Sequence, residues 1–257
     1  MKTLKIFLAA AAFLCFGFSR SYGGVLTADK DTLALYHFDE FYGPVDGKMA
    51  WTKDSGPNGL DMCYVNLTNG PTEGKYGKAI EFDKTKKQKI LCSFKDKFTR
   101  AYKDAEAITV ELWFYPTGNL DYECLFCQVG FPNAGFMVNW GEQAPGKNAW
   151  LQMRKVDGMD WHRLQGKLDP ELAFNAWHHF ACTWDDKKAQ VFIDGALIAY
   201  KDLGPGEEIN LSPADFWVGC RNGNEWFFSG KIDELRISRV VRTPEEIAAS
   251  ADRTPVK

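Results

Sequence analysis

Four short motifs in this 257-residue chain carry side chains that can act as acids, bases or metal ligands. They are Glu81-Phe82-Asp83, Cys124-x-x-Cys127, His178-His179 and Asp233-Glu234. Two carboxylates on one strand face can hydrolyse a glycosidic bond, one as nucleophile and the other as acid/base. A histidine can serve as general base, and paired cysteines can bind zinc or undergo redox chemistry. Which of these reactions is available depends on the faces to which the side chains point.

Strand alternation separates these pairs. His178 and His179 are adjacent in an alternating segment, so they point to opposite faces, and the same holds for Asp233 and Glu234. Cys124 and Cys127 also fall on opposite faces of a regular strand, and a disulfide between them needs a bulge or turn. A second CxxC or histidine pair at zinc-site spacing is missing from the sequence. The motifs therefore predict no catalytic residues.

The elements that must position these residues are strands. Apolar and polar residues alternate over residues 107–116 and 177–184, with Pro116 ending the first run. The pair Asp194-Gly195 between apolar runs at 190–193 and 196–200 indicates a type I′ hairpin. Further strands are predicted at residues 33–38, 78–82, 89–94, 124–129, 135–139, 150–156, 216–220 and 230–238.

Helix is nearly absent from these patterns until the end of the chain. There, Thr243 as N-cap, Pro244 at the first helical position and Glu246 as the capping-box partner predict a short helix through Ala249. No internal repeat or low-complexity linker marks a domain boundary after the first residues. The sequence therefore predicts one antiparallel double-sheet domain over residues 24–257.

Residues 1–23 have the three parts of a secretory signal peptide: Lys2 and Lys5, an apolar run over residues 6–18, and the small residues Ser21 and Gly23. The run is too short to span a bilayer comfortably, so we expect no stable membrane anchor in the mature chain. A buried N-terminal helix or a short anchor is the alternative. We expect a secreted, periplasmic or cell-surface protein.

Export would change the charge and the redox setting of the chain. The full sequence has 31 basic and 34 acidic residues. Removal of Lys2, Lys5 and Arg20 leaves 28 basic residues, hence a net charge of 28 − 34 = −6, which argues against a nucleic-acid partner. Disulfides can persist in an exported protein, and the sequence leaves the pairing of its cysteines open. The six concerned are Cys63, Cys92, Cys124, Cys127, Cys182 and Cys220.

Several segments together resemble the laminin-G-like, concanavalin A-like lectin/glucanase jelly roll, in particular its bacterial secreted members. The matching residues are Leu35-Tyr36-His37-Phe38-Asp39-Glu40, Asp54-Ser55-Gly56-Pro57-Asn58-Gly59, Gly77-Lys78-Ala79-Ile80-Glu81-Phe82, residues 108–115, Trp177-His178-His179-Phe180-Ala181, Val191-Phe192-Ile193-Asp194-Gly195, and residues 230–238. The resemblance implies an all-β, antiparallel, two-sheet jelly-roll sandwich. Its members include lectins, adhesion modules and glucanases, so it does not by itself decide the function.

The glucanases of this group use a Glu-x-Asp-x-x-Glu strand, which places three carboxylates on one face. The nearest match here begins at Glu81 and has Lys86 in the third acidic position. Glu111 is a lone acid on its strand face. We therefore expect no enzymatic activity, with a divergent glycan hydrolase as the remaining alternative.

The resemblance also implies a structural calcium ion near the meeting point of the first and last strands. Carried over residue by residue, Asp39 and Asp233 are the candidate ligands, and Asp54 in the loop of residues 54–59 can add a carboxylate. Calcium accepts six to eight oxygen ligands in irregular geometry. The alternative is that Asp39 begins a turn and Asp233 pairs with a basic residue.

Tryptophans are the predicted ligand contacts, because sugars present apolar C–H faces to aromatic rings. Trp113, Trp177 and Trp184 lie in predicted strands, where packing explains them. The three in polar, turn-rich surroundings are Trp140, Trp161 and Trp226. The sequence thus predicts an exported, non-catalytic module that binds an extracellular or cell-surface glycan. A protein-binding adhesion or surface-structural module is the alternative.

Overall fold

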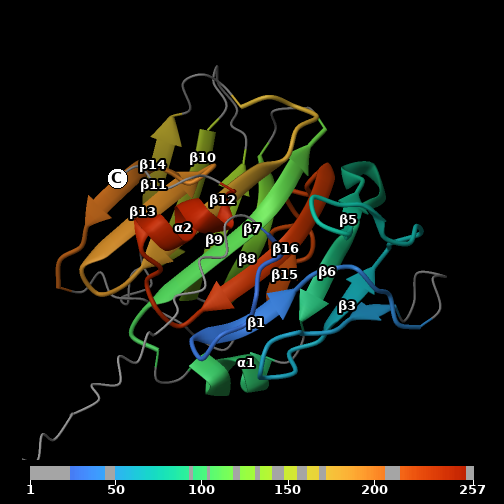
Figure 1. Ribbon diagram of the computed structural model, residues 1–257, viewed down its shortest axis with the longest axis horizontal. Coiled ribbons are helices and arrows are strands. Elements are labelled where there is room, and N and C mark those ends of the chain that lie inside the picture. The colour runs from blue at the N-terminus through green and yellow to red at the C-terminus, as the bar shows by residue number, and fades with distance from the viewer. Residues whose placement is uncertain are drawn as a thin grey trace, which may run out of the picture.

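The computed structural model describes residues 24–43, 50–92, 95–102, 105–117, 122–130, 134–140, 148–154, 161–167, 172–205 and 215–252. Two antiparallel sheets face each other and form a sandwich (Figure 1). The predicted two-sheet jelly-roll fold is therefore confirmed. The predicted signal peptide lies outside the described residues. None of the helices in the described part is long and apolar enough to cross a lipid bilayer.

Sheet A has the strand order β14-β13-β12-β7-β16-β5-β4, and β1 pairs with β16 beside this path. Its strands are β1 (Thr32–Tyr36), β4 (Thr72–Glu73), β5 (Lys78–Phe82), β7 (Ile108–Pro116), β12 (His178–Trp184), β13 (Lys188–Ile193), β14 (Ala196–Asp202) and β16 (Gly230–Ser238). The long strand β16 pairs first with β5 and then with β1, and Glu234 has a φ of 51° at this change of partner.

Sheet B has the order β11-β10-β9-β8-β15-β6-β3-β2. Its strands are β2 (Trp51–Thr52), β3 (Met62–Val65), β6 (Lys89–Cys92), β8 (Glu123–Gly130), β9 (Ala134–Trp140), β10 (Asn148–Arg154), β11 (Trp161–Lys167) and β15 (Phe216–Val218). The helical elements are the 3-10 turn η1 (Lys84–Lys86), α1 (Lys95–Tyr102) and α2 (Pro244–Ser250).

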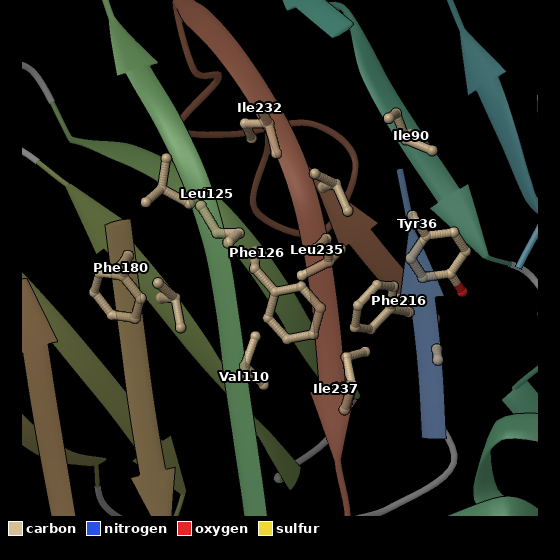
Figure 2. Close-up of a cluster of buried hydrophobic side chains, with 14 of the residues drawn as sticks. Tyr36, Ile90, Val110, Leu125, Phe126, Phe180, Phe216, Ile232, Leu235 and Ile237 are labelled. Carbon is tan, nitrogen blue, oxygen red and sulfur yellow. The ribbon is translucent and has the colours of Figure 1, made fainter. Parts of the chain in front are cut away.

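The core fills the space between the two sheets (Figure 2). Sheet A contributes Val110, Phe180 and Ile237, which face Phe126 and Phe216 of sheet B. The rings of Phe126 and Phe216 meet edge to face with centroids 3.9 Å apart. Because each fully buried phenylalanine contributes about 1.5–3 kcal/mol, this aromatic layer is a main source of stability.

The helix and turn predictions are partly confirmed. Thr243 caps α2, and its side chain and that of Glu246 form the predicted capping box. Asp194 and Gly195 have φ values of 47° and 73°, as a type I′ turn requires. The expectation that helix is nearly absent before the C-terminal end is wrong, because α1 follows β6. The strands β2, β3, β4 and β11 were not predicted, since they are short or lack apolar alternation.

A bulge in β8 corrects the predicted placement of two cysteines. The register of β8 against β9 shifts between Cys124 and Phe126. As a result Leu125 and Phe126 both join the core, while Cys124 and Cys127 lie together in a separate cluster with Met137. A bulge adds one residue to a strand and so breaks the alternation from which opposite faces were predicted.

Candidate functional site

The outer face of sheet A is closed to solvent at its centre. Glu111, His179 and Asp233 point away from the core, yet each is 0% exposed. Helix α2 lies over part of this face (Figure 1), where Ile247 packs against Phe192 of β13. The segments before β1 and β5 also contact this face, because Thr27 hydrogen-bonds to Arg236 and the loop residues Lys75 and Tyr76 hydrogen-bond to Asp233. This face therefore has no room for a macromolecular ligand at its centre.

A buried ion-pair cluster lies under these covers. Arg236 Nε and Nη2 donate to Glu111 Oε1 at 2.8 and 2.6 Å, and His179 Nε2 lies 3.4 Å from Glu111 Oε2. Burial by itself would raise the pKa of Glu111, but the charge of Arg236 and the hydrogen bonds of His179 and Arg236 outweigh it and lower the pKa to about 2. Glu111 is thus an ionised structural group, without the free second carboxylate that a glycosidase needs.

The side chains of two other motifs that could act as acids or bases also make structural hydrogen bonds. His178 Nδ1 lies 2.8 Å from Asp194 Oδ2, and its Nε2 lies 3.0 Å from the carbonyl oxygen of Ala173, which fixes the ring at the β13–β14 hairpin. Asp83 caps η1 by accepting the amide hydrogen of Thr85 at 2.9 Å. These contacts account for both motifs without a reaction.

Two of the three predicted calcium ligands contact one loop, residues 74–78. Asp39 Oδ1 accepts the amide hydrogen of Lys78 at 2.7 Å. Asp233 Oδ2 accepts those of Lys75 and Tyr76 at 2.9 and 3.0 Å. A Cβ atom at Gly77, whose φ is +58°, would collide with Asp39, so glycine is required for this close approach. The two aspartate side chains anchor the loop to β16 and to the segment that follows β1.

The third predicted calcium ligand, Asp54, holds a different loop, residues 54–60. Asp54 Oδ1 accepts the amide hydrogens of Leu35 and Gly56, and Oδ2 accepts that of Leu60. Burial raises the pKa of Asp233 to about 8, which favours its neutral form near neutral pH. Among the described residues, no group of three or more His, Cys, Asp and Glu side chains is placed to hold a metal ion. The donor set fits backbone anchoring better than calcium, and calcium binding stays a prediction.

The outer face of sheet B is accessible over one half, where a row of outward positions runs across β15, β6, β3 and β2. Beyond β15 the row continues into Cys127 of β8 and Met137 of β9, which are buried. Strand pairing aligns Trp217 of β15 with Leu91 of β6, Leu91 with Cys63 of β3, and Cys63 with Trp51 of β2. Cys63 is exposed, and the other three are half-buried. We call these four residues the open row. Its two tryptophans are separated by three strand spacings, about 14 Å.

Each end of the open row carries further aromatic and cationic groups. At the β15 end, Lys89 Nζ lies 5.7 Å from the ring centroid of Trp217 and 5.5 Å from that of Phe227. At the β2 end, Tyr42 stacks on Trp51 with centroids 4.9 Å apart, and Lys53 Nζ lies 4.4 Å from the Tyr42 ring. Rings with hydrogen-bonding cations beside them are the chemistry that binds sugars.

Of the predicted ligand tryptophans, Trp226 borders this site. It packs with Trp217 against the cluster of Cys124, Cys127 and Met137. Its ring stacks on Tyr122 with centroids 5.0 Å apart, and the Arg221 guanidinium carbon lies 4.5 Å from its centroid. Trp226 is thus half-buried, as Trp217 is, and the two tryptophans pack against the same cluster.

The other two predicted tryptophans lie in strands, so the prediction that they sit in loops is wrong. Trp140 ends β9 and pairs with Glu123, whose neighbour Cys124 donates its amide hydrogen to the Trp226 carbonyl oxygen at 2.8 Å. Trp161 begins β11 opposite Arg154, whereas Trp140 pairs with Ala149, five residues away on β10. Along the strand direction, the backbones of Trp140 and Trp226 thus lie at one end of sheet B, and that of Trp161 lies at the opposite end. The side chains of Trp140 and Trp161 lie outside the described part.

Sequence analysis did not identify the open row. Alternation in Phe216-Trp217-Val218 is the signal that finds Trp217, because the two flanking residues are buried in the core. No comparable signal exists for Trp51, since β2 has only two residues.

A family model described as the concanavalin A-like lectin/glucanases superfamily matches residues 96–248, more than half of the chain. No curated protein matches the sequence. Domain 4 of AbnA, a GH43 extracellular arabinanase from Geobacillus stearothermophilus solved with arabinotriose, is similar with a TM-score of 0.62 and 22% identity. That match covers 86% of this chain and 98% of the arabinanase domain.

Two further structures share the fold. The CBM40 of the Ruminococcus gnavus IT-sialidase, bound to alpha2,3 sialyllactose, matches with a TM-score of 0.52 and 19% identity over 67% of this chain and 96% of its own. The botulinum neurotoxin serotype D binding domain matches with a TM-score of 0.64 and 12% identity over 86% of this chain. This chain spans 51% of that domain. Identities this low establish a common fold and nothing about the ligand.

Proposed function

The chain belongs to the concanavalin A-like lectin/glucanases superfamily, and from this premise we propose that it is an exported, non-catalytic carbohydrate-binding module. We place its ligand on the outer face of sheet B, along the open row. Export rests on the signal-peptide pattern of residues 1–23. It also agrees with the extracellular arabinanase to which the similar domain belongs.

The single observation that carries this proposal is the difference between the two outer faces. Sheet A is covered at its centre, whereas Trp217, Leu91, Cys63 and Trp51 remain accessible over β15, β6, β3 and β2 of sheet B. An apolar row with a ring at each end matches the C–H faces of a bound saccharide chain. Two structural neighbours bind oligosaccharides, namely arabinotriose and sialyllactose.

The absence of catalysis is part of the proposal. Glu111 is held by Arg236, and Asp83 is used as a helix cap. Glu81 lies exposed on β5, and Lys86 occupies the third acidic position of the Glu-x-Asp-x-x-Glu pattern that glucanases use. A retaining or inverting glycosidase needs two carboxyl groups within about 5–10 Å across the scissile bond.

A glycan array with the mature protein tests this proposal. We expect wild-type protein to bind at least one oligosaccharide or polysaccharide. Trp217→Ala and Trp51→Ala should each weaken that binding by about tenfold or more, as loss of a central aromatic contact does at hot spots. Tyr200→Ala is the matched control, because Tyr200 is an aromatic residue 60% exposed on β14 of sheet A.

Three results would contradict parts of the proposal. Glycan binding that both tryptophan variants retain would move the site away from the open row. Absence of glycan binding together with specific capture of a purified surface protein would favour an adhesion module. Release of reducing ends from a bound polysaccharide would establish a hydrolase.

A further inference from the structure

We propose that the ligand of the open row is an anionic saccharide, which places one carboxylate or sulfate group near Lys89 and another near Lys53. This inference rests on the proposed function and specifies its substrate class. It follows from the positions of two lysines beside the row. The row therefore has positive charge at both ends, although the whole chain has a net negative charge.

The first cation is fixed in place by its own loop. Residues 84–89 read Lys-Thr-Lys-Lys-Gln-Lys, so four lysines occur within six residues. Asp83 caps η1, and the Oε1 of buried Gln88 accepts the amide hydrogen of Asp83 at 2.7 Å. Lys87 ends the turn with a φ of 54°. This geometry sets the start of β6, and with it the Lys89 side chain beside Trp217.

Lys89, unlike Lys86 and Arg221, has no carboxylate partner among the described residues. Lys86 pairs with Asp83 at 3.3 Å, and Arg221 pairs with Glu225 at 2.8 Å. Lys89 Nζ instead donates to the Gly223 carbonyl oxygen and lies over two rings. An ammonium group has three donor hydrogens, so Lys89 can still donate to a bound anion.

Lys53 has a matching position at the other end of the row. It is exposed, its Nζ lies over Tyr42, and no carboxylate of the described residues forms an ion pair with it. One carboxylate does lie at this end, since Glu40 accepts the hydroxyl hydrogen of Tyr42, but it forms no ion pair with Lys53. Each end of the open row thus has two rings and an ammonium group that forms no ion pair within the described residues.

A single-stranded nucleic acid also combines rings with negative charge, but the observations favour a saccharide. The middle of the row consists of Leu91 and Cys63, which offer apolar contact but no aromatic surface for successive bases. The C–H faces of a saccharide can contact the apolar middle of the row, and its acidic substituents can bind the lysines at the two ends.

Affinity electrophoresis and calorimetry of the mature protein test this inference. The probes are polygalacturonate for carboxylates, dextran sulfate for sulfates, and linear arabinan and dextran as neutral polysaccharides. We expect tighter binding to one or both anionic probes than to the neutral ones, and weaker binding as NaCl rises from about 50 to 300 mM. Lys89→Gln and Lys53→Gln should each lower the affinity for the anionic probe by about tenfold. Lys187→Gln, 83% exposed on sheet A, is the matched control and should change nothing.

The outcomes separate this inference from the function on which it rests. Equal binding of neutral and anionic probes, insensitive to both lysine variants but lost in Trp217→Ala, would overturn the inference and leave the carbohydrate-binding function intact. Failure to bind any glycan, on the array or in this panel, would overturn both. Tighter, Lys89-dependent binding of poly-uridylate would overturn the inference in favour of a nucleic-acid ligand.

Discussion

Arg236 and Glu111, which are 125 residues apart, form a buried two-donor ion pair between β16 and β7. Arg236 also donates to the Thr27 carbonyl oxygen at 3.1 Å and to Ser250 Oγ at 3.2 Å. One guanidinium group therefore joins sheet A to the segment before β1 and to the last residue of α2. This contact attaches both covering segments to the centre of the outer face of sheet A.

Replacing Glu111 by glutamine should strongly destabilise the fold. The variant leaves the Arg236 charge buried without a counter-charge, and breaking a buried pair costs about 3–5 kcal/mol. Urea denaturation measures the free energy of unfolding directly. Lys30→Gln is the control: it breaks an exposed pair with Asp31 and should cost less than about 1 kcal/mol. Equal, small losses in both variants would contradict the role given to Arg236.

The same pair predicts how stability depends on acid. The pKa of Glu111 is about 2 in the folded chain, below its usual value of 4.5. Its contribution is therefore complete above about pH 4.5 and is lost as pH falls towards 2, because the unfolded chain binds the proton first. Asp29, whose pKa is lowered by its hydrogen bond with Arg242, adds to this loss. In unfolding titrations between pH 6 and 3, Glu111→Gln should show a shallower slope than wild type, and an unchanged slope would contradict the assignment.

Much of the fold follows from sequence because most of its strands alternate cleanly. Strands β5 and β16 match their predicted bounds, and β7 and β12 agree within one residue, since apolar residues recur at every second position in most of these segments. The faces of Cys124 and Cys127 could not be predicted, because a bulge is a tertiary adjustment without a local residue signal. Helix α1 escaped prediction because its residues, Lys95 to Tyr102, carry few apolar side chains.

The site was harder to predict for a related reason. Loop-like composition selected Trp140, Trp161 and Trp226, but strand pairing decides which tryptophans share a surface. Trp51 and Trp217 are far apart in sequence and lie on one row only because β3 and β6 lie between their strands. Such non-local pairing is not encoded in any short window of residues.

Thiol reactivity should distinguish the accessible cysteine of the open row from the buried ones. Cys63 is exposed, whereas Cys124, Cys127 and Cys182 are at most 2% exposed. Burial raises the pKa of Cys182 to about 12 and holds that of Cys124 well above its usual value, so these thiols stay protonated and slow to react. We expect Ellman's reagent to label Cys63 rapidly in the native protein and the five buried thiols, which include Cys92 and Cys220, only after unfolding. Rapid labelling in Cys63→Ser would contradict this.

Metal removal tests whether the three aspartates anchor the backbone without a calcium ion. Asp39, Asp54 and Asp233 accept amide hydrogens, and this anchoring requires no ion. We expect the melting temperature to stay the same when EDTA is added to the purified protein. A fall that added calcium reverses would instead establish the calcium site that the family resemblance implies.

The most direct test of the central claim, that a glycan binds along the open row, is the labelling rate of Cys63 with and without the best ligand from the glycan array. Cys63 lies between Trp51 and Leu91, so a bound saccharide should cover its thiol. We predict that the rate falls in proportion to ligand occupancy and that Trp217→Ala loses this protection, while Tyr200→Ala retains it. Saturating glycan that leaves the Cys63 labelling rate unchanged would contradict the account.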